Sequence, residues 1–308
     1  MASSSLVLFT SKTGTTFSSN KIINLTYTKE RYTPYTKVTG TVVTDDNLSD
    51  IMIINLKLGQ RIVHTGIVDT LESEYRNGKR CVSFSSRGYT CALGQNQLTP
   101  GMYTQITFSE LMTGEIALPN VNYQSVSTAI NYVYIKDNDS MWDSAVAFCR
   151  KYNGDYPYVY GPNTIRVSRY ADSSVITIPS ASVISSSMGQ DFTKMVSHLH
   201  MKDIEGTYNT YNMTNSAATS RSVIRHKQIP FDRQWLNNPT EALQSRIDFS
   251  NRGYMYKKLS YCGYNNEDLR KLVSVSTRSF TVSSQEISKL SVNLSQKGII
   301  TTLWFYQS

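Results

Sequence analysis

The sequence predicts a mainly β protein with an α+β insert, in which two β-rich modules flank a small α/β module. Serine and threonine make up 71 of the 308 residues, and there are 21 tyrosines against 8 prolines. Threonine and tyrosine pack well on a half-buried pleated surface. Most of the chain alternates between apolar and polar residues, and only its middle has a helical period. An apolar content of 40% with a net charge of +8 excludes a disordered chain.

Residues 1–105 are expected to form the N-terminal β-barrel module. Ile23, Leu25 and Tyr27 alternate on one strand face, and Pro34 predicts a strand break or an edge. Asn77-Gly78 is the strongest hairpin signal, because both residue types tolerate positive φ. Five or so short strands within residues 20–90 favour a small antiparallel barrel. A short helix over residues 87–96 would close this module.

Residues 106–178 are expected to form the small α/β insert. A helix is predicted over residues 106–118, and a second one over residues 140–152 with Asp139 or Ser140 as its N-cap. Ser140 and Asp143 have the spacing of a capping box, and Gly154 lies where a left-handed C-cap is needed. A hairpin should follow, with strands at 156–160 and 165–167.

Residues 179–308 are expected to form a second β-rich barrel module with one helix. Asn238-Pro239 predicts the start of that helix, which continues through Leu243 and Ile247. The pattern places strands on both sides of the helix. Their expected ranges are 180–187, 193–203, 208–213, 222–228, 257–263, 270–282 and 289–305, the last with a turn at Lys297-Gly298.

Charge and targeting signals indicate a protein that stays where it is made. Residues 179–308 carry +6 of the net charge of +8, which could face an acidic partner. No sequence-specific nucleic-acid motif accompanies the basic residues. The apolar run Leu6–Phe9 is too short for a secretory signal, and no apolar run is long enough for a membrane helix. The four cysteines match no zinc or redox spacing, so free thiols are expected.

The residue types that act in catalysis or metal binding do not occur in any known motif here. The sequence therefore predicts no catalytic, cofactor or metal site, and no enzyme. His198 and His200 could share a strand face, with His226 as the nearest third histidine, but two half-exposed histidines are favoured over a metal site. Cys149 lies on the apolar stripe of the predicted 140–152 helix, which favours a core thiol. Asp143, Asp155 and Glu205 have no spacing that distinguishes an acid–base pair. Phosphate-binding glycine loops are absent.

Two groups of residues are candidates for a partner interface. Tyr156, Tyr158 and Tyr160 would line one face of a strand, where each ring offers apolar area and a polar tip. Such a stripe could bind a protein or a sugar, or it could pack on the adjacent helix. Arg225 and Lys227 are the second group, on the basic C-terminal module.

Several short motifs then follow one another in a familiar order. Tyr32-Thr-Pro-Tyr35, Leu58-Gly59, Thr65–Asp69 and Ser83–Thr90 occur in the first module, Asp139–Tyr152 with Tyr156-Pro157-Tyr158 in the insert, and Glu241–Tyr254 with Lys258–Gly263 in the last module. In this arrangement the chain resembles the central hub proteins of contractile phage-tail or tail-like particle baseplates, the late-control family with two β-barrels. The resemblance spans roughly residues 20–305.

The resemblance implies a structural protein of the virion, assembled in the bacterial host cytoplasm. It implies a fold of two small antiparallel β-barrels plus a small α/β module. It also implies a homotrimer whose six barrels form a pseudo-sixfold ring between the sixfold tail tube and the threefold central spike. The implied partners are the spike, the tube or tube-initiator protein, baseplate wedge proteins and the tape-measure protein, without a membrane. Two alternatives stay open: a carbohydrate- or receptor-binding β module of a virion that uses the tyrosine stripe, and a tail-borne cell-wall hydrolase.

Overall fold

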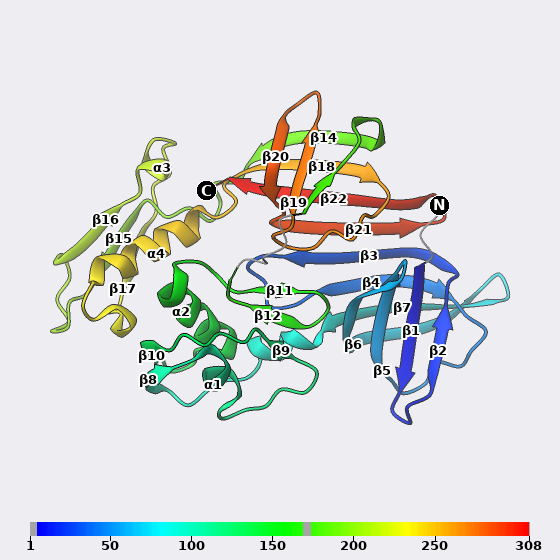
Figure 1. Ribbon diagram of the computed structural model, residues 1–308, viewed down its shortest axis with the longest axis horizontal. Coiled ribbons are helices and arrows are strands. Elements are labelled where there is room, and N and C mark those ends of the chain that lie inside the picture. Colours follow the sequence, from blue (N-terminus) through cyan, green and yellow to red (C-terminus); the bar gives the residue numbers. More distant parts are fainter. Residues whose placement is uncertain (1–4, 169–173, 308) are drawn as a thin grey trace. The chain divides into compact units, whose positions relative to one another are not determined.

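The computed structural model describes residues 5–168 and 174–307 (Figure 1). The chain divides into two compact units. We call the described part of residues 1–186 and 259–304 the large unit, and that of residues 187–258 and 305–308 the small unit. The division into 1–105, 106–178 and 179–308 stays a prediction.

The largest sheet confirms the mainly β class. Its strands are β1 Ser5–Ser11, β2 Thr16–Ser19, β3 Ile22–Glu30, β4 Lys37–Val43, β5 Ile51–Leu58, β6 Arg61–Arg76, β7 Lys79–Gly88, β14 Val183–Gln190, β18 Met255–Cys262, β21 Lys289–Ser295 and β22 Gly298–Gln307. Their order is β14-β18-β22-β21-β3-β4-β7-β6-β5-β1-β2. Strands β21, β3 and β4 run side by side in Figure 1, whereas β5, β1 and β2 run in a clearly different direction, so the sheet is strongly curled.

The strand and turn signals of residues 20–90 are confirmed. Leu25 and Tyr27 are buried in β3, as their alternation predicts. Pro34 lies in the break between β3 and β4. Asn77 and Gly78 join β6 to β7 with φ of 51° and 73°, which is the positive φ that a two-residue hairpin turn requires.

A small α/β region follows in the large unit. It contains the 3-10 helix η1 Tyr89–Gly94, strands β8 Gly101–Ile106, β9 Asn122–Tyr123, β10 Ile130–Ile135, β11 Tyr158–Tyr160 and β12 Thr164–Arg166, and helices α1 Phe108–Thr113 and α2 Met141–Asn153. One apolar core, which includes Phe108, Trp142 and Phe148, joins these elements. The two helices predicted at 87–96 and 106–118 are thus shorter than expected, and the first is a 3-10 helix. Helix α1 ends at Thr113, with Gly114 as its C-cap.

Helix α2 agrees closely with its sequence signals. The Ser140 hydroxyl accepts a hydrogen bond from the Asp143 amide while the Asp143 side chain accepts from the Ser140 amide, which is a complete capping box. Gly154 has φ of 73° and closes the C-terminus in the left-handed conformation. The predicted hairpin after the helix is confirmed as β11 and β12, paired antiparallel.

A third small sheet of the large unit is formed mainly by its C-terminal part. Strands β13 Val175–Thr177, β19 Leu272–Ser276 and β20 Thr281–Glu286 form it, and the 3-10 helix η2 Ser180–Ser182 follows β13. The single strand predicted over 270–282 is therefore wrong. The Thr277 hydroxyl accepts hydrogen bonds from the amides of Ser279 and Phe280, and this turn separates two antiparallel strands.

The small unit contains a three-stranded sheet, two α-helices and a 3-10 helix. Its elements are β15 His198–Met201, β16 Tyr211–Thr214, α3 Ser216–Thr219, β17 His226–Ile229, the 3-10 helix η3 Arg233–Trp235 and α4 Pro239–Asn251. Leu199, Leu243 and Ile247 share its core. The strand predicted from residue 193 starts only at His198, because Asp191 accepts the Thr193 amide and forms a turn. Asn238 and Pro239 start α4 as predicted. Among the described residues, no helix has the length and apolarity that crossing a membrane requires.

Candidate functional site

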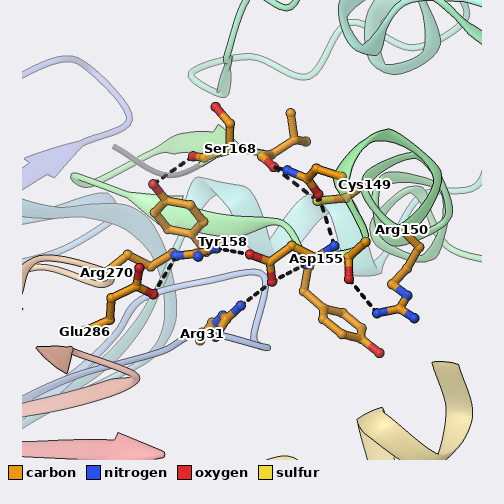
Figure 2. Close-up of polar contacts among 12 residues, drawn as sticks. Arg31, Cys149, Arg150, Asp155, Tyr158, Ser168, Arg270 and Glu286 are labelled. Atoms are coloured by element: carbon orange, nitrogen blue, oxygen red, sulfur yellow. Dashed lines mark hydrogen bonds and ion pairs between the residues drawn. The ribbon is translucent and has the colours of Figure 1, made fainter. Parts of the chain in front are cut away.

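A network of charged side chains lies in the large unit where three segments meet (Figure 2). Arg31 follows β3 directly, Asp155 follows α2, and Arg270 and Glu286 belong to the segment around β19 and β20. With Lys29 and Asp268, which lie beside them in sequence, these residues form what we call the polar junction. It connects the N-terminal strands, the α/β insert and the C-terminal strands of the same unit.

Asp155 is positioned by the end of helix α2. Gly154 reverses the chain, and the Asn153 side-chain oxygen then accepts the Asp155 amide at 3.0 Å. The Asp155 Oδ1 atom accepts the Tyr156 amide at 2.8 Å. This turn therefore positions the carboxylate by local hydrogen bonds.

Two arginines from distant parts of the sequence converge on Asp155. Arg31 donates to Oδ1, and Arg270 Nη1 donates to Oδ2 at 2.5 Å. Arg270 Nε also donates to Glu286 Oε2 at 3.1 Å. The Arg270 side chain is only 1% exposed, so its charge is taken out of water and depends on these two carboxylates.

The charges of the network stabilise one another. Burial alone would raise the pKa of Asp155, but the positive charges of Arg31 and Arg270 bring it below its ordinary value. Burial would lower the pKa of Arg270, but Asp155 and Glu286 raise it. Both groups therefore stay ionised at neutral pH.

Lys29 and Asp268 extend the junction to the hairpin of the insert. Lys29 donates to Asp268 Oδ1, and its Nζ atom also donates to the Gly161 carbonyl at 2.8 Å. The Gly161 amide donates to Asp268 Oδ2 at 2.7 Å. Burial lowers the pKa of Lys29, and the Asp268 charge opposes that effect. The turn between β11 and β12 is thus held through both its amide and its carbonyl.

The arrangement suits a structural clamp better than proton transfer. Each charged group of the junction has a partner of opposite sign, and the ionised state of Asp155 is favoured, so this carboxyl is a poor general acid. Cys149 lies next to the junction, where its thiol donates to the Val167 carbonyl at 3.3 Å (Figure 2). Burial raises the pKa of this thiol, which opposes its use as a nucleophile.

The tyrosine stripe is placed beside the junction. Tyr158 is fully buried, donates to the Ser168 carbonyl at 3.2 Å, and has its ring centre 5.4 Å from the Arg270 guanidinium carbon. Tyr156 and Tyr160 are half-buried. The Tyr156 ring packs edge-on against Tyr32. The central ring of the stripe is therefore used within the large unit.

The two basic candidates belong to the small unit and differ from each other. Arg225 donates through Nη1 to the carbonyls of Phe192, Thr193 and Met195 at 2.6–3.1 Å, so its guanidinium holds a loop in place. Lys227 is exposed on β17. Both side chains are exposed, and Arg225 is the one whose guanidinium is held by three backbone carbonyls.

Three of the four histidines meet on one face of the small-unit sheet. His198 and His226 lie opposite each other in β15 and β17, with ring centres 4.1 Å apart, and His200 Nε2 is 3.2 Å from His226 Nδ1. The sequence pointed to this convergence through the spacing of His198 and His200. Across residues 5–168 and 174–307, no group of three histidine, cysteine or acidic side chains has a geometry that could hold a metal ion.

The remaining acidic candidates are not brought together, and no sequence motif marks the arginines of the junction. Asp143 caps α2, whereas Glu205 is exposed in a loop of the small unit. Arg31 and Arg270 carry no motif in the sequence, and they are 124 and 115 residues away from Asp155. Only the Gly154-Asp155 turn had a local signal.

Comparison with solved structures shows a fold shared with tail proteins. A tail protein from Neisseria meningitidis MC58 matches with a TM-score of 0.72 at 14% identity, over 100% of this chain and 97% of that chain. The 43 kDa tail protein of prophage MuSo2 from Shewanella oneidensis matches with a TM-score of 0.68 at 13% identity, over 98% of both chains.

A third similar structure belongs to a secretion system. The E. coli c3393 protein, a component of the type VI secretion system described as structurally similar to the T4 tail proteins gp27 and gp5, matches with a TM-score of 0.53 at 8% identity, over 94% of this chain and 74% of that chain. No protein-family model and no curated protein sequence matches the chain. At these identities the comparisons establish the fold.

Proposed function

We propose that the chain is a structural component of a phage tail or phage-derived tail-like particle, and specifically its baseplate hub. In this proposal three copies form a ring that adapts the sixfold tail tube to the threefold central spike. The ring contacts the spike, the tube or tube-initiator protein and the baseplate wedge proteins. The chain has no enzymatic role in this proposal.

The observation that carries this proposal is the match along the whole chain. The matches to two tail proteins extend over 97% and 98% of the length of those proteins, with TM-scores of 0.72 and 0.68. The sheet, the insert and the small unit therefore all lie within the shared fold. Fold similarity does not by itself fix a function. The described similarity of the secretion-system neighbour to gp27 and gp5 supports the hub among the possible tail components.

The polar junction is consistent with a structural role. It joins three segments of the large unit through ion pairs that are largely shielded from water, and shielded pairs are screened little by salt. A subunit that transmits load between a tube and a spike must keep its insert and its strands in one arrangement. The junction provides that fixation with residues from all three segments.

The test is the solution mass of the purified protein by light scattering, followed by assembly in particles. The trimer has three times the chain mass of 34.8 kDa, which is 104 kDa. We expect that mass, and we expect particles from a producing strain to stall before the tube joins the spike when the gene is deleted. A chain that stays at 34.8 kDa at every concentration, together with normal particles from the deletion strain, would refute the hub.

A further inference from the structure

One face of the large sheet is covered almost entirely by small hydroxyl and amide side chains. Pairing across six neighbouring strands, β22-β21-β3-β4-β7-β6, aligns them in rows. The first row is Gly298, Ser295, Asn24, Thr41, Ser83 and Glu72. The second row is Ile300, Asn293, Thr26, Thr39, Ser85 and Thr70. We call these two rows the hydroxyl face.

The opposite side of the same strands is apolar and buried. Leu294, Leu25 and Phe84 alternate with the residues of the hydroxyl face and are at most 5% exposed. The strand period of two therefore separates a core side from a polar side. Much of the unusual serine and threonine content of strands β3, β4, β7 and β21 lies on this one face.

Side chains of the hydroxyl face bond to one another across strands, and a hollow lies in the face. Thr26 Oγ1 donates to Asn293 Oδ1 at 2.8 Å, and the hydroxyls of Thr41 and Ser83 are 3.0 Å apart, so side chains bond sideways to neighbouring strands. A hollow of about 510 Å3 lies in the face, and Thr26, Thr41 and Ser83 are among the residues that line it.

This composition matches neither an ordinary outer surface nor a subunit contact. Charged residues make up 18% of the whole chain, but the twelve positions of the two rows hold one, Glu72, and no lysine or arginine. Subunit contacts are enriched in aromatic residues, methionine and arginine and depleted in serine. The third row starts with Thr302, Ser291 and Thr28 and becomes basic only at Lys37 and Arg87.

From this pattern we infer that the hydroxyl face forms the inner, water-filled wall of the proposed ring. This inference rests on the proposed trimer and adds which surface of the chain turns inward. Short hydroxyl side chains hydrogen-bond water and carry no charge. A polymer that passes along them therefore finds no group with which to form an ion pair. The wall is thus built to let material pass without binding it.

The chain supplies its own probe for this inference. Cys262 is an exposed free thiol at the end of β18. It is two residues from Ser260, whose hydroxyl is 2.9 Å from that of Thr302, so Cys262 lies on the same side of the sheet as the third row. A second probe is Thr41→Cys in a Cys262→Ser background, which places one thiol inside the first row.

The experiment compares two maleimides on protein whose mass has first been measured by light scattering. One is small and the other is carried on a polymer too bulky to enter a ring. In the 104 kDa species we expect both probes to react freely with the small reagent and an order of magnitude more slowly with the bulky one. Protein unfolded in urea is the control, and there the two reagents should react alike with each probe.

Each other outcome has its own meaning. Equal labelling by both reagents in the 104 kDa species would place the face on the outside of the ring. Protection from both reagents would place it in a subunit contact. Either result overturns the inference without contradicting the trimeric ring. A mass of 34.8 kDa would remove the ring itself, which is the failure of the proposed function. The double variant Thr39→Lys with Thr41→Lys should keep the 104 kDa mass. If the face were buried between subunits, the two lysines would disrupt the contact and the 104 kDa species would be lost.

Discussion

Replacing Asp155 by asparagine tests whether the polar junction holds the insert on the sheet. The change keeps the size of the side chain but removes the charge that Arg31 and Arg270 share. Arg270, whose side chain is 1% exposed, would keep Glu286 as its counter-ion. Changing one partner of a buried ion pair costs about 3–5 kcal/mol, because the other charge is left in a poor solvent.

We expect the lower end of that range for Asp155→Asn, about 3 kcal/mol, since Glu286 remains and Asp155 is itself 25% exposed. For a unit of this size the loss corresponds to a fall in melting temperature of about 6–12 °C. Circular dichroism during heating gives the melting temperature. Hydrogen exchange of helix α2 should show where the loosening begins.

A matched control is Asp45→Asn, which removes an exposed partner of Lys21 at 3.8 Å, with side chains 65% and 90% exposed. Exposed pairs of this kind contribute little, so this variant should melt like the wild type. The reasoning about the junction would be refuted if Asp155→Asn melted within error of Asp45→Asn.

The pH dependence gives a second check on the same variant. The folded-state pKa of Asp155 is lowered below its ordinary value of 3.8, so its ionised form stabilises the protein fully above that value. This contribution is lost as the pH falls through the folded-state pKa. The difference between wild type and Asp155→Asn should therefore shrink under acid conditions, and a difference independent of pH would contradict an electrostatic origin.

Three further predictions concern other parts of the molecule. Burial raises the pKa of Glu267 from 4.5 to about 7, so its ionisation destabilises the fold as the pH rises through that window. The variant Glu267→Gln should therefore be more stable than wild type at pH 8, by up to about 3 kcal/mol, and similar to it at pH 4. Equal urea midpoints of the two proteins at pH 8 would refute this. A Cβ on Gly66 would lie 2.2 Å from the Arg87 carbonyl oxygen, so Gly66→Ala should lose about 3 kcal/mol in urea unfolding, a loss that an unchanged midpoint would exclude. Lys227→Glu should leave the melting temperature unchanged while Arg225→Glu lowers it, because only Arg225 holds backbone carbonyls; equal effects would contradict this distinction.

Local features of this protein could be predicted because they depend on neighbours in sequence. The Asn77-Gly78 hairpin, the Ser140–Asp143 capping box and the Gly154 C-cap each require only a few consecutive residues, and all three are confirmed. The alternation in β3 likewise showed which side chains would be buried. The helices at 87–96 and 106–118 were overestimated, because short apolar runs do not show where a helix ends.

The sequence by itself thus determined the mainly β class and the local turns and caps. Only the tertiary structure decided that Arg31 and Arg270 share Asp155, since these contacts span 124 and 115 residues and no local motif marks them. It also decided the hydroxyl face, where Thr26 and Asn293 meet across 267 residues because β3 pairs with β21. The physical reason is that propensity and capping act over one turn or one strand, whereas strand partners and registers are chosen by the burial that the whole chain achieves together.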